Sequence, residues 1–157
     1  MKQRLARLLK GKIVIVGIGN PLRGDDGLGP LLVGRLKGRV PAVCIDAGSA
    51  PENYAGAVIR EEPDTVLLID SVHLGEAPGS AALLEEDEIA RSGLSTHDIP
   101  LSMFIGYLKS RTRARVFLLG VEPQSLAFGE GICEAVQKSL ETIAKDIMEV
   151  LTCTKPT

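Results

Sequence analysis

The chain has 157 residues, of which 45% are hydrophobic and 24% are charged, and its formal net charge is −2 at pH 7. This length and composition predict a single globular domain over residues 1–157 and argue against a disordered chain. The slight negative charge and the 3% aromatic content offer neither the basic surface nor the stacking side chains typical of nucleic-acid binding. We therefore expect no nucleic-acid partner.

In chain order, short apolar runs alternate with stretches of helical periodicity. The predicted strands are Ile13–Ile18, Ala42–Ile45, Val66–Ile69 and Val116–Val121, with a short fifth strand at Ala81–Leu84 that suits an antiparallel position. The predicted helices are Leu28–Lys37, Glu52–Arg60, Leu101–Leu108 and Ile132–Leu151. Glu85–Glu88 is interpreted as a solvated face or the N-terminus of a helix, and Lys109–Arg115 as solvated charge. The alternation predicts an α/β domain on a largely parallel sheet.

The cellular compartment is inferred from the cysteines and from the absence of targeting patterns. No window approaches the ~18 consecutive apolar residues of a membrane-spanning helix. Charges interrupt the basic stretch Met1–Lys10, so we do not interpret it as a secretory signal. Cys44, Cys133 and Cys153 are widely spaced and form no C-x-x-C pair, which is typical of a reducing compartment, with Cys44 as a core residue. We expect a cytoplasmic protein without a membrane span.

A glycine-rich loop follows the first predicted strand and displays two adjacent carboxylates, Asp25 and Asp26. Neighbouring acids on a loop indicate a metal site or acid–base chemistry. The loop does not match the dinucleotide-binding pattern G-x-G-x-x-G, because Leu22 stands at the third glycine. The chain also lacks the G-x-S-x-G elbow and the P-loop lysine motif, which argues against serine acyl transfer and Walker-type nucleotide hydrolysis.

Aspartates occur near the end of each of the first three predicted strands. Asp25 and Asp26 follow the first strand, Asp46 the second and Asp70 the third. Because ligands of open α/β sheets bind outside the carboxyl ends of the strands, these acids should gather at one edge. Crowded carboxylates raise one another's pKa unless a cation holds them together. The alternative is that each aspartate caps a turn or a helix.

The chain has two histidines, His73 and His97. His97 lies in a predicted loop that opens a helix, and one imidazole with two carboxylates suits nickel, zinc, manganese or iron. A single loop histidine is more often a surface residue. On spacing alone, His73 competes with His97, because it follows Asp70 closely in the sequence.

Five motifs in order carry a family resemblance: GIGNPLRGDDGLGP at residues 17–30, DAGS at 46–49, LLIDSV at 67–72, PG at 78–79 and STHDIPL at 95–101. This set resembles the [NiFe]-hydrogenase maturation endopeptidases, particularly the hydrogenase-3 type. The resemblance implies a three-layer α/β/α sandwich on a mostly parallel five-stranded sheet with one antiparallel strand.

The resemblance also implies a function and a site. Members remove the C-terminal tail of a [NiFe]-hydrogenase large-subunit precursor after nickel insertion, and three of their side chains recognise the bound nickel. On this chain the three catalytic and metal-binding positions fall on Asp26, Asp70 and His97. Nickel would be presented by the precursor, and zinc or another divalent ion can take its place. Asp46 and Gly48 are expected to line the substrate groove.

Other residues and functions remain open at this point. Asp25 is interpreted as a turn residue or as an acceptor behind the metal ligands, and the resemblance assigns no role to His73. The opening Gly17–Pro21 is also similar to that of peptidyl-tRNA hydrolases, although Leu22–Asp26 departs from that family. A third hypothesis is that the protein is a non-catalytic sensor of a metallated partner, because no side chain in the sequence is required to be a covalent nucleophile.

Overall fold

A five-stranded sheet forms the centre of the molecule in the computed structural model, which describes residues 1–96 and 99–153. The strand order is β2-β1-β3-β7-β4; the first four strands are mutually parallel, and β4 pairs antiparallel with β7. The strands are β1 (Ile13–Ile18), β2 (Val43–Gly48), β3 (Thr65–Ser71), β4 (Ala81–Leu84) and β7 (Arg115–Val121). The expected sheet, including its antiparallel strand, is confirmed.

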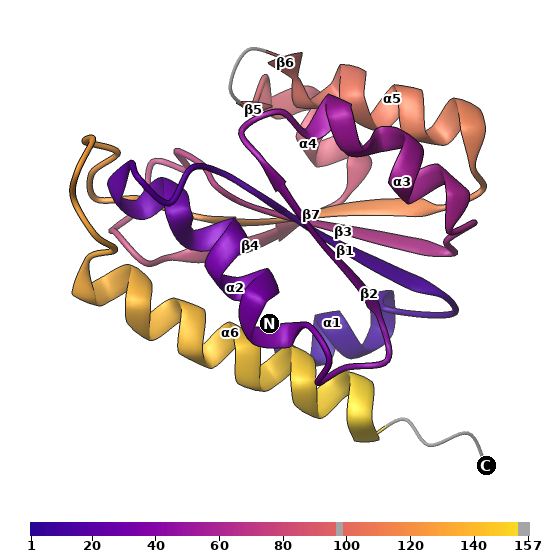
Figure 1. Ribbon diagram of the computed structural model, residues 1–157, viewed down its shortest axis with the longest axis horizontal. Helices are drawn as coiled ribbons and strands as arrows, with labels where there is room; N and C mark the ends of the chain where they lie inside the picture. The colour runs from indigo at the N-terminus through magenta and orange to yellow at the C-terminus, as the bar shows by residue number, and fades with distance from the viewer. Residues whose placement is uncertain (97–98, 154–157) are drawn as a thin grey trace.

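Helices cover both faces of the sheet and complete three layers (Figure 1). One face carries α1 (Lys2–Leu8), α2 (Leu28–Leu36) and α6 (Glu134–Cys153), and the other carries α3 (Ala55–Arg60), α4 (Glu86–Ser92) and α5 (Leu101–Arg111). Successive strand residues point to opposite faces, so Ile15 packs in the core under the first group of helices and Val14 and Val16 under the second. This is why every residue of β1 is buried and why its sequence is continuously apolar.

Several element boundaries differ from the sequence prediction. β2 and β3 extend beyond their apolar runs, so that Asp46 and Asp70 lie inside strands and not after them. The reason is that the backbone ladder continues, with Asp46 opposite Gly17 and Asp70 opposite Gly120. The helix predicted over Glu52–Arg60 is a 3-10 turn, η2 (Pro51–Tyr54), followed by the shorter α3.

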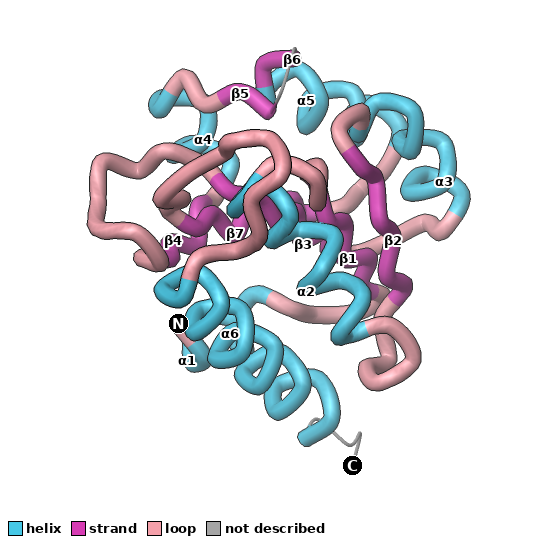
Figure 2. Tube along the Cα trace, turned by 60° about the vertical axis from the view of Figure 1, so that its left-hand side comes forward, coloured by secondary structure: helices cyan, strands magenta, loops and turns pink. Residues whose placement is uncertain are grey.

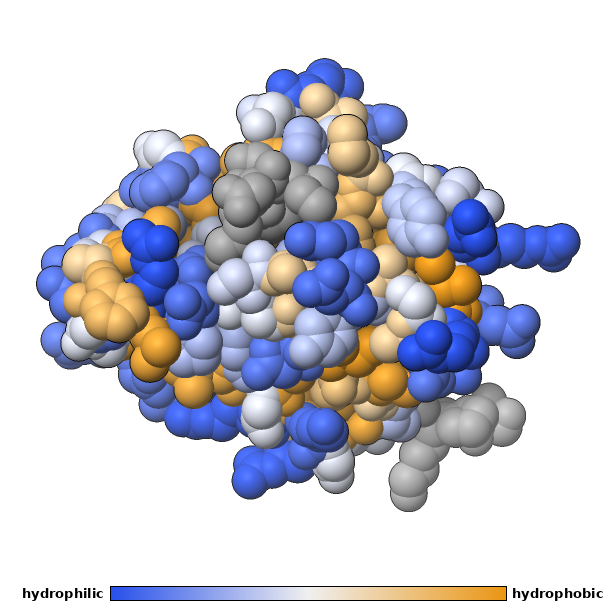
Figure 3. Space-filling view, turned by 45° about the horizontal axis from the view of Figure 1, so that its top comes forward, coloured by the Kyte–Doolittle hydropathy of each residue, from blue (hydrophilic) through white to orange (hydrophobic). Residues whose placement is uncertain are grey.

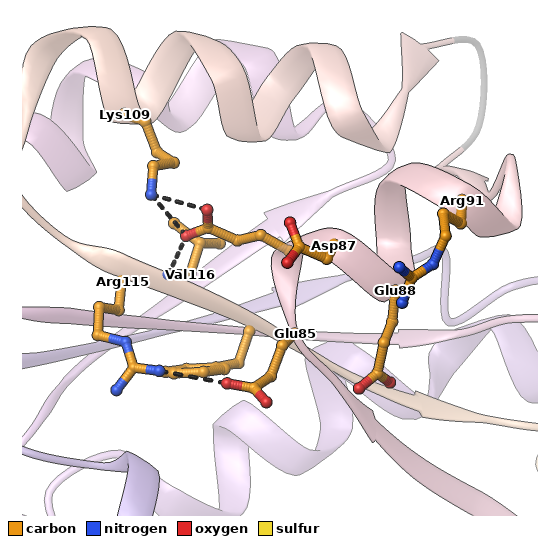
Figure 4. Close-up of a pocket in the computed structure, with 9 residues that line it drawn as sticks. Glu85, Asp87, Glu88, Arg91, Lys109, Arg115 and Val116 are labelled. Carbon is orange, nitrogen blue, oxygen red and sulfur yellow. Dashed lines mark hydrogen bonds and ion pairs between the residues drawn. The ribbon is translucent and has the colours of Figure 1, made fainter.

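The acidic segment Glu85–Glu88 forms the N-terminus of α4, where carboxylates suit the helix dipole. A cavity of about 330 Å³ lies there, beside the first residues of β7. Figure 4 shows Arg115 directed at Glu85, with Nη2 3.2 Å from Oε1. Lys109 forms an ion pair with the adjacent Glu86, with Nζ 2.7 Å from Oε2. These ion pairs join α4, α5 and β7, so the charges are solvated but also structural.

The surface is mixed in character. Blue hydrophilic and orange apolar side chains alternate over the face drawn in Figure 3. Among the residues that the structure describes, no helix combines the length and the apolar character needed to cross a membrane. Cys44 is buried as expected, and burial raises the pKa of its thiol.

Candidate active site

The sheet topology creates a crevice between β1 and β3. From β1 the chain continues through α2 to β2 on one side, whereas from β3 it continues toward β4 and β7 on the other. Neighbouring parallel strands whose connections diverge in this way leave a binding site at their carboxyl ends. Figure 2 looks toward this edge, where pink loops gather in front of the sheet.

A pocket of about 390 Å³ opens at these strand ends and contains two of the predicted site residues. Asp26 lies in the 3-10 helix η1 (Gly24–Gly27) after β1, and Asp70 lies near the end of β3. Both are buried, with exposed fractions of 8% and 2%. The pocket is lined by Arg23, Asp26, Asp70, Ser71, Val72, His73, Gly93, Leu94 and Leu126.

Hydrogen bonds fix the carboxylate of Asp26. The backbone N–H of Asn20 donates to Oδ2 at 2.8 Å, and the hydroxyl of Ser71 donates to Oδ1 at 3.5 Å. The turn that brings Asn20 to this carboxylate requires a glycine before it. Gly19 has φ +141°, and a Cβ there would lie 1.8 Å from the carbonyl oxygen of Asp26.

The third predicted site residue, His97, lies outside the described residues. The segment before it reaches the site, because Gly93 and Leu94 line the pocket and lead into β5 (Ser95–Thr96). β5 pairs antiparallel with β6 (Ile99–Pro100). Within residues 1–96 and 99–153, no three His, Cys, Asp or Glu side chains group as a metal site. The assignment of His97 as a ligand therefore stays a prediction.

His73 is the other histidine of the pocket. Its side chain is 75% exposed, and its Nδ1 lies 3.7 Å from Oε1 of the buried Glu122. Since it lines the pocket together with Asp26 and Asp70, it remains the alternative imidazole to His97.

Asp25 differs from Asp26 in its surroundings although the two are adjacent in sequence. It is 1% exposed and accepts hydrogen bonds from the backbone N–H groups of Cys133, Gln124 and Ser125. Burial alone would raise the pKa of this carboxyl, but the three backbone donors outweigh burial and hold the pKa below its ordinary value. Asp25 is thus an ionised acceptor that binds the loop after β7.

The two residues expected to line a substrate groove have local contacts. Asp46 is exposed, and its Oδ1 accepts the backbone N–H of Gly48 at 3.0 Å. The carbonyl of Gly48 in turn accepts the N–H of Gly19 at 2.8 Å, which ties the end of β2 to the turn after β1. Neither residue lines the pocket of Asp26 and Asp70, and their role toward substrate stays a prediction.

Sequence reasoning assigned no site role to several residues that line the pocket, among them Arg23, Ser71 and Leu126. A signal existed for Leu126. The loop over residues 122–133 follows the parallel strand β7, and every such loop begins at the carboxyl edge of the sheet. Arg23 and Ser71 lie next to recognised motif residues but carry no pattern of their own.

The fold and the pocket together define a class of protein: an α/β domain with two buried carboxylates at the switch point of a mostly parallel sheet. Such carboxylates serve acid–base chemistry or bind a cation.

Comparisons with known proteins narrow this class. A family model described as hydrogenase maturation protease matches residues 31–150. The chain is similar to the hydrogenase 3 maturation protease of Escherichia coli K12, with 33% identity over 83% of this chain and 85% of the relative. It is also similar to the crystal structure of a [NiFe] hydrogenase maturation protease from Thermococcus kodakarensis, with 32% identity, a TM-score of 0.87 and coverage of 95% and 99%.

A more distant structure, the hydrogenase-maturating endopeptidase HybD of E. coli, shares the fold at 24% identity, with a TM-score of 0.73 and 91% of each chain covered. The chain belongs to the hydrogenase maturation protease family. The resemblance seen in the five ordered motifs is confirmed, and the chain belongs to this family and not to the peptidyl-tRNA hydrolases.

Proposed function

We propose that this protein is an endopeptidase that removes the C-terminal tail of a [NiFe]-hydrogenase large-subunit precursor after nickel insertion. The observation that carries the proposal is the convergence of Asp26 and Asp70 in one pocket at the carboxyl ends of β1 and β3, in a chain of the hydrogenase maturation protease family. We place the reaction in the cytoplasm, in keeping with free cysteines at 44, 133 and 153.

Nickel enters the proposal as a part of the substrate. Carboxylate oxygens and an imidazole nitrogen are suitable donors for this ion, so Asp26, Asp70 and His97 would bind nickel that the precursor already holds. Zinc or another divalent ion would bind the same donors. Bound metal supplies Lewis acidity, which polarises a carbonyl or activates water.

The protein's own contribution is orientation. Asn20 and Ser71 hold the carboxylate of Asp26 from two sides, so little reorganisation is needed when a cation arrives. Arg23 lines the same pocket and adds a positive charge to its wall. A cation that the precursor presents would bind the two carboxylates, which favours the metallated form.

The test mixes the purified protein with nickel-loaded and nickel-free precursor and follows the tail by mass spectrometry. We expect cleavage of the loaded precursor alone, and loss of cleavage in Asp26→Asn, Asp70→Asn and His97→Ala. Asp64→Asn is the matched control, because Asp64 also accepts a backbone N–H, that of Lys12, but lies before β3 at the opposite edge. Equal cleavage of both precursors contradicts nickel recognition. If the protein binds the precursor but cleaves it under no metal condition, the result supports the hypothesis of a non-catalytic sensor.

A further inference from the structure

Two loops at the carboxyl edge are joined through one buried carboxylate. Asp25, in the segment 20–26, accepts the N–H of Cys133 at 2.8 Å on Oδ1, and the N–H groups of Gln124 and Ser125 at 2.7 and 3.1 Å on Oδ2. All three donors belong to the region from the end of β7 to the start of α6. Both oxygens are thus used to hold the backbone of this second segment.

Backbone hydrogen bonds reinforce the same junction. The N–H of Asp25 donates to Ser125 at 2.9 Å, that of Gly24 to Glu130 at 3.1 Å, and that of Gly129 to Leu22 at 2.8 Å. Gly24 has φ +55°, and a Cβ there would lie 2.5 Å from the carbonyl oxygen of Ser125. The two segments therefore approach as closely as a glycine permits.

This junction gives a fixed shape to a loop that has no regular structure of its own. Residues 122–133 form no helix or strand, and long connections of this kind in compact domains are commonly functional. Placing a carboxylate at 1% exposure costs desolvation, which the three backbone donors must offset. A surface held in this way loses little conformational freedom when a partner binds.

The joined segments carry two sets of side chains that matter here. Arg23 and Leu126 line the pocket that contains Asp26 and Asp70. Leu22 and Phe128 are 62% and 76% exposed, and the hydrogen bond from Gly129 to Leu22 keeps the two regions adjacent. Large apolar side chains are thus exposed on the same segments that form the pocket wall, where they are available for contact with an apolar surface of a partner.

We propose that segments 20–26 and 122–133 form the docking wall for the protein substrate, with Leu22 and Phe128 as its apolar contacts and Asp25 as the residue that positions it. The occupant is an apolar surface of the hydrogenase precursor beside the tail, so the inference rests on the proposed function. A protease of this family acts on a protein, and the segments that carry Leu22 and Phe128 also supply Arg23 and Leu126 to the pocket, so a substrate whose tail enters the pocket comes close to these segments.

The first test removes the apolar contacts. The double variant Leu22→Ser/Phe128→Ser should raise the KM for nickel-loaded precursor by about tenfold or more, as expected for truncated contact residues, with kcat unchanged. Met103→Ser is the matched control, because Met103 is 65% exposed but lies on α5, outside the wall. An unchanged KM in the double variant, or the same rise in Met103→Ser, overturns the proposal.

The second test addresses Asp25. Asp25→Asn removes no surface side chain, yet it should raise the KM several-fold at unchanged kcat, whereas Asp64→Asn should change neither. A folded Asp25→Asn protein with the original KM overturns the positioning role. Hydrogen exchange of the unaltered protein provides a measurement that does not depend on the variant: the amides of Gln124, Ser125 and Cys133 should exchange slowly, and rapid exchange of all three contradicts the junction.

The two proposals fail differently. If the unaltered protein leaves every precursor intact, the proposed function is wrong. If it cleaves the loaded precursor and the double variant does so with the same KM, only the docking wall is wrong.

Discussion

The hydroxyl of Ser71 lies 3.5 Å from Oδ1 of Asp26 and donates a hydrogen bond to it. Ser71 is the last residue of β3 and directly follows Asp70, whereas Asp26 belongs to the turn after β1. The contact therefore connects the two strand ends that supply the carboxylates of the pocket. It ties the orientation of one carboxylate to the strand that carries the other.

We predict that Ser71→Ala lowers the kcat/KM for tail removal by about two- to fivefold, because a single long hydrogen bond contributes about 1 kcal/mol or less to orienting Asp26. Thermal unfolding should change little, since Asn20 still holds the other oxygen of Asp26. Ser110→Ala is the control, because the hydroxyl of Ser110 donates to the carbonyl of Tyr107 within α5 and does not line the pocket of Asp26. A loss of activity equal in both variants would show that the Ser71 contact has no special role.

Alanine substitutions at Gly19 and Gly38 should distinguish the effect of steric conflict from the effect of backbone strain. Both have positive φ, +141° and +78°, but a Cβ at Gly38 meets nothing within 4 Å, whereas at Gly19 it collides with the backbone of Asp26. Gly38→Ala should lower the free energy of unfolding by about 1–2 kcal/mol. Gly19→Ala should lower it by more than about 3 kcal/mol and displace Asp26. Urea denaturation measures both, and equal losses would contradict the close approach.

The fold and part of the site could be predicted because their signals are local. Strands that are buried on both faces have short, continuous apolar sequences, which allowed the sheet to be predicted. Asp26 follows β1 and Asp70 lies near the end of β3, so the rule that ligands bind at the carboxyl edge of the sheet predicted that the two residues lie close together. The sequence prediction places the C-terminal ends of β2 and β3 too early in the chain. A polar residue inside a ladder, such as Asp46 opposite Gly17, leaves no apolar signature.

The junction between segments 20–26 and 122–133 could not be predicted for a different reason. The groups that Asp25 binds are backbone N–H groups, and nearly every residue type provides one. Nothing in the side chains of Gln124 or Ser125 therefore marks them as its partners. Two adjacent aspartates look alike in sequence, although one lines the pocket and the other holds a loop.

Metal binding should distinguish the two histidines. Imidazole binds a metal ion only when neutral, so Ni²⁺ affinity should fall as the pH drops through about 6.5, the ordinary pKa of histidine. Calorimetric titration should show this fall in the unaltered protein and in His73→Ala. His97→Ala should bind at least about tenfold more weakly at pH 7.5 and lose the pH dependence. The reverse pattern would assign the ligand role to His73.

Acid should destabilise the protein partly through Asp25. Because the folded state holds the pKa of this carboxyl below its ordinary value, its contribution is complete above the unfolded pKa of about 4 and is lost as the pH falls through the folded pKa. Asp25→Asn removes this titration and keeps the shape of the side chain. At pH 7 the variant should have a free energy of unfolding lower by about 1.5–3 kcal/mol, the value of hydrogen bonds to a charged group.

The difference between the two proteins should narrow below about pH 4, where the carboxyl of the unfolded chain takes up its proton. Urea denaturation in EDTA from pH 7 to pH 2.5 measures the difference without interference from metal at the neighbouring Asp26. Other carboxylates titrate in both proteins and largely cancel in the comparison. A gap that stays constant over this range would show that Asp25 is not held as a carboxylate, and a gap that widens in acid would reverse the sign of its pKa shift.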